Sequence, residues 1–200
     1  MKPQSKPQAP PLSLHEVAED NLRYIRATME SSTVFTGVSG KGYMAAGTLA
    51  LIAAWIAARQ TSDNAWLAVW MIELVLGAGI AFYLSSKKAQ SLGSSVWSSS
   101  GRKLLLAFLP AMAVGGMLTI AFYLHGTVQL LPGIWLSLYG AATMTAGLWS
   151  IRIIPLMGAV FLALGAIVMF SGVSADLILA AGFGGVHIGF GLLIWRKYGG

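Results

Sequence analysis

Long apolar runs separated by short polar segments fill the chain from residue 42 onward. A helix that crosses a bilayer needs about 20 mostly apolar residues, and six runs approach or reach this length. None of them has the polar face that a helix of a soluble protein turns to water. Because backbone groups in lipid must be satisfied internally, each run is expected to be a helix. The pattern predicts an all-α, polytopic membrane protein with a six-helix transmembrane bundle over residues 42–200, its spans at about 42–58, 65–84, 104–124, 130–149, 153–170 and 175–195.

The part of the chain before the first run is polar and falls into two segments. Residues 1–12 are rich in proline and polar side chains, which is typical of a disordered tail. Residues 13–41 are expected to form an amphipathic helix and a linker, because Ser13 and Glu16 fit a capping box and apolar residues follow at roughly helical spacing. Such a helix is suited to lie on the cytoplasmic membrane surface, to dock on the bundle or to bind a partner protein. The sequence leaves these three alternatives open.

The composition agrees with a membrane protein and narrows the chemistry. Apolar residues make up 56% of the chain and charged residues 10%, whereas soluble domains carry about 25% charged residues. Cysteine is absent, which excludes disulfides, thiol nucleophiles, Cys-ligated zinc and iron–sulfur clusters. The basic residues do not gather into a stripe that would bind nucleic acid, so the expected partners are the lipid bilayer, further copies of the chain or other membrane subunits.

Lysine and arginine indicate how the spans are oriented. Six spans place both termini on one side, and that side then holds twelve of the thirteen basic residues. Arg59 is the exception. Cytoplasmic loops carry an excess of these residues. The distribution predicts a multi-pass protein of the inner (plasma) membrane with both termini in the cytoplasm.

Glu73 is the first of two ionisable residues that lie deep in a predicted span. It follows the start of the second span by eight residues, roughly 12 Å at the rise of a helix. Ionisable groups at such depth are costly and are therefore candidates for function. Glu73 is either a proton or cation site, or a carboxyl group that is hydrogen-bonded between helices.

His187 is the second deep ionisable residue, and glycines surround it in the sixth span. Ala181, Gly185 and Gly189 follow one another at intervals of four, a spacing that lets helices approach closely. The plainer interpretation is helix packing, with His187 hydrogen-bonded across the interface. The alternative is a ligand for a metal or for the metal of a haem- or chlorophyll-type cofactor. The sequence leaves the metal and cofactor content unknown. Glu73 and His187 differ by about 6 Å in expected depth, so they form a buried pair if their spans are neighbours.

Catalytic signatures are missing from the spans: no HExxH motif, nucleophile elbow or paired carboxylate motif occurs there. An enzyme is therefore not expected. The leading hypothesis is a non-catalytic membrane subunit or accessory protein that packs through glycine-rich helix faces. One alternative is a small transporter or channel that uses Glu73, and another is a cofactor-binding subunit that uses His187.

Residues 22–47 begin Leu-Arg-Tyr-Ile-Arg-Ala-Thr-Met-Glu and reach into the first span. This stretch resembles part of uncharacterised bacterial multi-span membrane proteins. The resemblance covers a small part of the chain. It implies a bacterial inner membrane and carries no activity.

Overall fold

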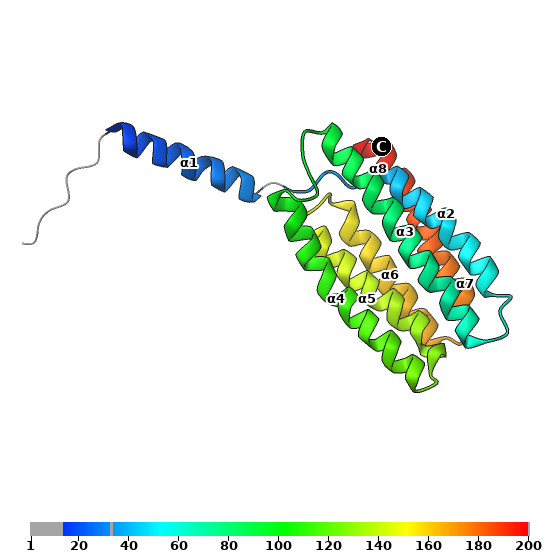
Figure 1. Ribbon diagram of the computed structural model, residues 1–200. Coiled ribbons are helices and arrows are strands. Elements are labelled where there is room, and N and C mark those ends of the chain that lie inside the picture. The colour runs from blue at the N-terminus through cyan, green and yellow to red at the C-terminus, as the bar shows by residue number, and fades with distance from the viewer. Residues whose placement is uncertain (1–13, 33, 200) are drawn as a thin grey trace, which may run out of the picture. The chain divides into compact units, whose positions relative to one another are not determined.

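The computed structural model describes residues 14–32 and 34–199, and the regular elements of this part of the chain are helices. It contains no strand, and one isolated bridge pairs Phe35 with Ser150. The predicted all-α class is therefore confirmed, while the tail predicted at residues 1–12 lies outside the described residues. The elements, shown in Figure 1, are α1 (Leu14–Ser32), α2 (Gly40–Ala57), α3 (Asp63–Ser91), α4 (Ser99–Leu124), the 3₁₀ turn η1 (Val128–Leu130), α5 (Leu131–Gly147), α6 (Ile153–Phe170), α7 (Ala175–Leu179), the π-helical segment η2 (Ala180–Val186) and α8 (His187–Tyr198).

The chain divides into two units, residues 1–33 and 34–200. The first unit contains α1, which lies where the sequence predicts an N-terminal helix. The side chains of the predicted capping box, Ser13 and Glu16, fall outside the described residues. Among the apolar residues of α1 that are described, Val17, Leu22 and Ile25 are exposed.

Four helical segments are long and apolar enough to cross a membrane: Asp63–Ser91, Ser99–Leu124, Ile153–Phe170 and Ala175–Tyr198. The last of these segments consists of α7, η2 and α8, which follow one another without a break. The predicted membrane protein is confirmed in this form, with four span-forming segments. The other two predicted spans correspond to α2, with 18 residues, and α5, with 17 residues, which fall short of this combination of length and apolar character.

The helices extend beyond the second and third predicted spans. These spans leave residues 85–103 between them, and in the structure α3 continues to Ser91 and α4 begins at Ser99. Two local signals set these limits. Gly93 adopts a positive φ of 68° just after α3, a conformation that ends helices. The side chain of Ser98 accepts a hydrogen bond from the backbone N–H of Gly101 and so caps α4.

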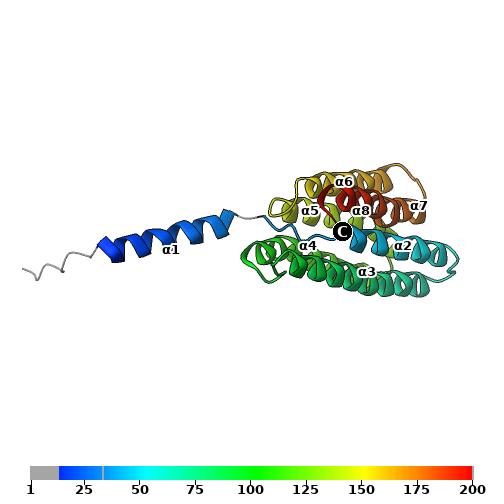
Figure 2. The same cartoon turned by 90° about the horizontal axis from the view of Figure 1, so that it is seen from above.

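Residues 34–199 form two layers of helices, which Figure 2 shows from above. One layer contains α2, α3 and α4, and the other contains α5, α6, α7 and α8. The tightest pairs are α5 with α6 and α2 with α3, while α4 on α5 and α2 on α8 join the layers at their two edges. Large apolar side chains fill the space between the layers, and Leu136, Met157, Phe161 and Leu179 are completely buried there.

Hydrogen bonds tie together the end of the bundle at which α2 begins. The backbone N–H of Phe35 donates to Trp149 O at 2.7 Å, and Ser150 Oγ donates to Phe35 O at 2.9 Å. Lys88, at the end of α3, is buried and donates from Nζ to Val38 O at 3.1 Å and to Gly199 O at 2.6 Å. These contacts hold the segment before α2, the α5–α6 loop, the end of α3 and the end of α8 at one level.

Candidate functional site

A cavity of about 610 Å³ lies within the bundle between α3 and α4. Helix packing explains its position, because α3 packs mainly on α2 and α4 packs mainly on α5. Small residues on both facing helices, Gly77 and Ala78 on α3 and Gly115 and Gly116 on α4, leave the space unfilled. The opposite wall comes from α2, α5, η2 and α8, which contribute Tyr43, Ala46, Trp135, Leu138, Tyr139, Phe183 and His187.

The rim of the cavity faces sideways. Leu74 on α3 and Leu109 on α4 both line the cavity, and they are 53% and 54% exposed. Both residues lie well inside helices that are able to span a membrane. In a bilayer their depth is that of the hydrocarbon core, so the opening between α3 and α4 faces lipid chains.

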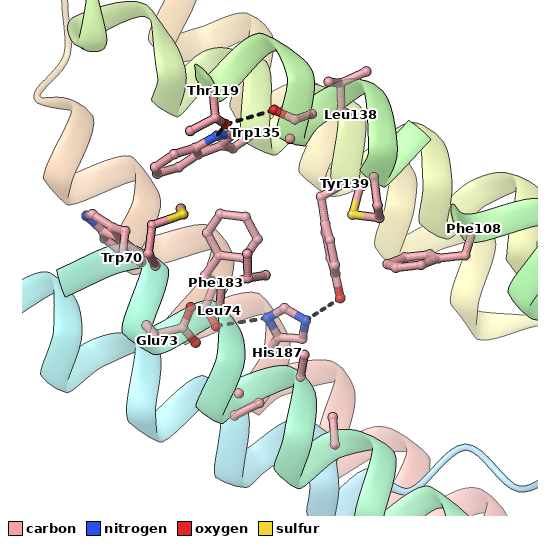
Figure 3. A pocket seen from close by; sticks show the side chains of 18 of the residues that line it. Trp70, Glu73, Leu74, Phe108, Thr119, Trp135, Leu138, Tyr139, Phe183 and His187 are labelled. Atoms are coloured by element: carbon pink, nitrogen blue, oxygen red, sulfur yellow. Dashed lines mark hydrogen bonds between the residues drawn. The ribbon is translucent and has the colours of Figure 1, made fainter. Parts of the chain in front are cut away.

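Glu73 lines this cavity from α3 together with Phe183 and His187, and Figure 3 shows the side chains of all three. Among the described residues no hydrogen bond or ion pair reaches its carboxyl group. Gly77, one turn further along α3, makes room for it, since a Cβ at Gly77 would lie 2.7 Å from Glu73 Oε1. The predicted carboxyl group between helices is therefore a cavity residue without a protein partner in the described part of the chain.

His187 is 7% exposed and is the first residue of α8, directly after the π-helical segment η2. Its Nε2 lies 2.7 Å from Tyr139 Oη on α5, and its Nδ1 lies 2.9 Å from Phe183 O. A carbonyl oxygen only accepts, so Nδ1 carries the proton and donates to Phe183 O. In the neutral ring Nε2 then accepts from the Tyr139 hydroxyl. His187 is thus hydrogen-bonded across a helix interface, as the plainer interpretation predicts.

The same geometry bears on the predicted cofactor role of His187. A neutral imidazole coordinates a metal through its unprotonated nitrogen, and that nitrogen is occupied by Tyr139. Aromatic rings also enclose the imidazole, with centroids at 5.4 Å for Tyr43, 5.3 Å for Tyr139 and 5.2 Å for Phe161. No group of three or more His, Asp or Glu side chains able to hold a metal occurs within residues 14–32 and 34–199. The site therefore does not fit a haem- or chlorophyll-type ligand at His187.

Glu73 and His187 line the same cavity, which agrees with the similar depths estimated from the sequence. They do not form a direct ion pair or hydrogen bond in the part of the chain that the structure describes. His187 instead takes Tyr139 as its side-chain partner. Tyr139 is the functional candidate that sequence analysis missed, since a tyrosine within an apolar span is indistinguishable from a packing residue.

A second polar pair lies in the wall of the cavity. Trp135 Nε1 donates to Thr119 Oγ1 at 2.8 Å, and Thr119 Oγ1 donates to Gly115 O at 2.7 Å. Both side chains are therefore satisfied within the protein. Figure 3 shows this pair apart from the His187–Tyr139 pair, with Phe183 between them. Glu73 is the acidic residue of the lining, and its carboxyl group remains free to meet a ligand.

The glycines that bring α8 close to α2 are not those that the sequence indicates. Ala181, Gly185 and Gly189 are exposed, and a Cβ at Gly185 or Gly189 would meet nothing within 4 Å. The close contact uses Gly184 and Gly191 instead: a Cβ at Gly191 would lie 2.8 Å from Gly40 O. Ala181, Gly185 and Gly189 therefore do not contact another helix of the described chain, and their packing role stays a prediction for contacts with a further chain. The π-helical segment η2 contributes to the change of face, because its wider turns shift the later residues away from α-helical periodicity.

Comparisons with protein-family models, with curated proteins and with solved structures give no match.

Proposed function

We propose that the chain is a non-catalytic, six-span protein of the bacterial inner membrane that binds a lipid-soluble molecule in the cavity between α3 and α4. The observation that carries the proposal is the sideways opening of an apolar cavity at hydrocarbon depth, with one free carboxyl group inside. Its volume of about 610 Å³ falls within the roughly 300–1,000 Å³ of small-molecule sites. Transport of the bound molecule, with Glu73 as the proton or cation site, is an extension of the same proposal.

The count of six rests on the position of α2 and α5. The 18 residues of α2 and 17 residues of α5 correspond to about 27 Å and 26 Å, close to the roughly 30 Å of a hydrocarbon core. Each packs between two of the four span-forming segments: α2 contacts α3 and α8, and α5 contacts α4 and α6. Helices that run between membrane-crossing neighbours occupy the same depth as those neighbours.

The orientation rests on charge. Of the nine lysines and arginines in residues 34–199, eight lie at the end of the bundle where Lys88 bonds to Gly199. Arg59 lies at the other end, in the α2–α3 loop. An excess of basic residues marks the cytoplasmic side, so we place this end and the C-terminus in the cytoplasm.

Thiol labelling tests the topology, since the chain has no cysteine of its own. Single variants Thr36→Cys and Ser62→Cys flank α2. A membrane-impermeant maleimide added to intact cells is expected to label Ser62→Cys and to spare Thr36→Cys until the cells are broken. Equal labelling of both variants before lysis would show that α2 does not cross and would overturn the six-span arrangement.

Occlusion of the cavity tests the ligand site. Gly116 lines the cavity and has open space beside it, so Gly116→Trp fills it from α4. Gly79 on α3 also faces open space but does not line the cavity, which makes Gly79→Trp the matched control. Native mass spectrometry of protein extracted from its own membrane should find a bound small molecule that Gly116→Trp loses and Gly79→Trp keeps. Equal binding by the two variants, or a wild-type protein without bound molecules, would refute the site.

A second candidate function is that of an accessory subunit, and one observation favours it. The small-residue face of Ala181, Gly185 and Gly189 is exposed on α8 and η2, so it is available to another helix. Replacing Gly189 by leucine is expected to separate the protein from a second copy or partner that packs there. Unchanged mass of the complex after gentle extraction would remove this candidate.

A further inference from the structure

The cavity has an unusual balance of charge, which limits the ligands that it is able to hold. Glu73 is the one carboxylate among its lining residues, and no lysine or arginine of the described chain lines it. Two of the neutral polar groups are used, because His187 bonds to Tyr139 and Phe183 and Thr119 bonds to Trp135, while Trp70 Nε1 has no partner in the described chain. The cavity therefore offers a ligand a single acidic group in mainly apolar and aromatic surroundings.

Aromatic rings supply most of the remaining lining. Six aromatic residues besides His187 contribute from α2, α3, α4, α5 and η2: Tyr43, Trp70, Phe108, Trp135, Tyr139 and Phe183. The faces of such rings carry a negative electrostatic potential and attract cations, quaternary ammonium groups among them. In a site without water this attraction is larger than at an exposed surface. Rings and carboxylate therefore favour the same sign of charge.

We infer that the molecule bound between α3 and α4 is a lipophilic organic cation, with Glu73 as its counter-ion and the aromatic residues around its charged centre. The inference rests on the proposed function, since it assigns a chemical class to the ligand of that site. The apolar lining from Leu74, Leu109 and Met112 accommodates the hydrocarbon part of such a molecule. The opening at hydrocarbon depth matches the place where a lipophilic cation partitions.

Other ligand classes fit the lining less well. An anion such as a fatty acid would bring a second carboxylate beside Glu73 and would find no basic side chain among the described lining residues. A neutral lipid would leave Glu73 without a partner in a dry site, which is costly for an acidic group in a membrane. A cation meets neither difficulty.

Binding of a matched pair of ions tests the inference. Tetraphenylphosphonium and tetraphenylborate are alike in size and shape and opposite in charge. With full-length protein in nanodiscs of zwitterionic lipid, we expect tetraphenylphosphonium to bind saturably, near one per chain, and to quench tryptophan fluorescence because Trp70 and Trp135 line the cavity. Tetraphenylborate is expected not to bind saturably. Equal binding of both ions would overturn the assignment of a cation.

Variants at position 73 identify the counter-ion. Glu73→Gln keeps the size of the side chain and is expected to weaken tetraphenylphosphonium binding at least tenfold, whereas Glu73→Asp should retain most of it. Gly77→Ala should weaken binding as well, because a Cβ there would meet Glu73 Oε1 at 2.7 Å. Circular dichroism and gel filtration check that each variant folds. Wild-type affinity in folded Glu73→Gln would refute the role of Glu73.

The outcomes separate this inference from the proposed function. If tetraphenylphosphonium fails to bind but Gly116→Trp still removes a bound small molecule, the lateral site stands and the cation class is wrong. If neither the ion nor a native molecule binds, both proposals fail. If tetraphenylphosphonium binds and both Glu73→Gln and Gly116→Trp abolish binding, both proposals are supported.

Discussion

Gly140 and Gly158 lie where α5 and α6 approach each other closely, and this contact permits a sharp prediction. A Cβ on Gly158 would lie 2.6 Å from Gly140 O and 2.6 Å from the backbone N of Met144. A Cβ on Gly140 would lie 2.8 Å from Gly158 O. The opposing atoms belong to the backbone, so they are unable to turn aside as a flexible side chain would. Replacing either glycine by alanine must push the two helices apart.

Two opposing terms determine the size of the effect. Overpacking a well-filled core costs typically about 1–3 kcal/mol, and a clash between two backbones belongs at the upper end of this range. Alanine in place of glycine within a helix stabilises the folded state by about 0.5–1 kcal/mol, because the unfolded chain has less conformational entropy to lose. We therefore expect Gly158→Ala to lower the free energy of unfolding by about 2 kcal/mol, or roughly 30-fold in the folding equilibrium.

Gly189→Ala is the matched control for this measurement. It lies in a helix of the same bundle, but its Cβ would meet nothing within 4 Å. The entropic term then acts alone, and we expect a stabilisation of about 0.5–1 kcal/mol. The assay is reversible unfolding in mixed micelles with increasing dodecyl sulfate, followed by tryptophan fluorescence.

Opposite signs for the two variants support the packing argument. A Gly158→Ala protein as stable as the wild type would refute it, because the backbone contact would then have no energetic weight. Destabilisation by Gly189→Ala would instead indicate that another chain covers the exposed face of η2 and α8. That result would favour the accessory-subunit candidate.

Three further substitutions test polar contacts within the bundle, each by the same unfolding assay unless stated. Tyr139→Phe removes the hydroxyl bonded to His187 and should cost about 1 kcal/mol; stability equal to wild type would contradict the hydrogen bond. Trp66→Phe removes the 2.8 Å bond from Nε1 to Asp176 Oδ1 and should cost about 0.5–1.5 kcal/mol, with unchanged stability as the contrary result. Lys88→Met leaves the carbonyls of Val38 and Gly199 without their donor; hydrogen exchange at the end of α8 should accelerate, and unaltered protection would argue against this bridge.

Hydropathy alone locates most of the helices, because burial in lipid demands a run of apolar residues whatever the neighbouring helices are. The fifth predicted span, 153–170, coincides with α6. The predicted sixth span, 175–195, falls within Ala175–Tyr198. Hydropathy is less informative over residues 85–103, since serine and lysine suit a helix end as well as a loop. Only the capping contact of Ser98 and the turn at Gly93 distinguish the two.

The candidate site was less accessible from the sequence. Depth along a helix follows from counting residues, so the sequence predicts similar depths for Glu73 and His187. Which helices are neighbours depends on contacts between segments far apart in the chain, and the hydrophobic pattern of a single helix does not predict those contacts. Tyr139 and the cavity itself belong to this second kind of information. The glycines of η2 and α8 illustrate the same limit: Gly184 and Gly191 on one face and Gly185 and Gly189 on another are equally small, and only the position of α2 decides which face is in contact.

The bond between Phe35 and Ser150 has a consequence for the order of events during synthesis. The two residues are 115 positions apart, so at roughly 5–20 residues per second the ribosome needs about 6–23 s to deliver the second partner after the first. Until then the segment before α2 lacks its hydrogen-bond partners in the α5–α6 loop. The segment before α2 therefore becomes fixed late, and the insertion machinery must tolerate this end of the bundle without its final partner while α2, α3, α4 and α5 are made.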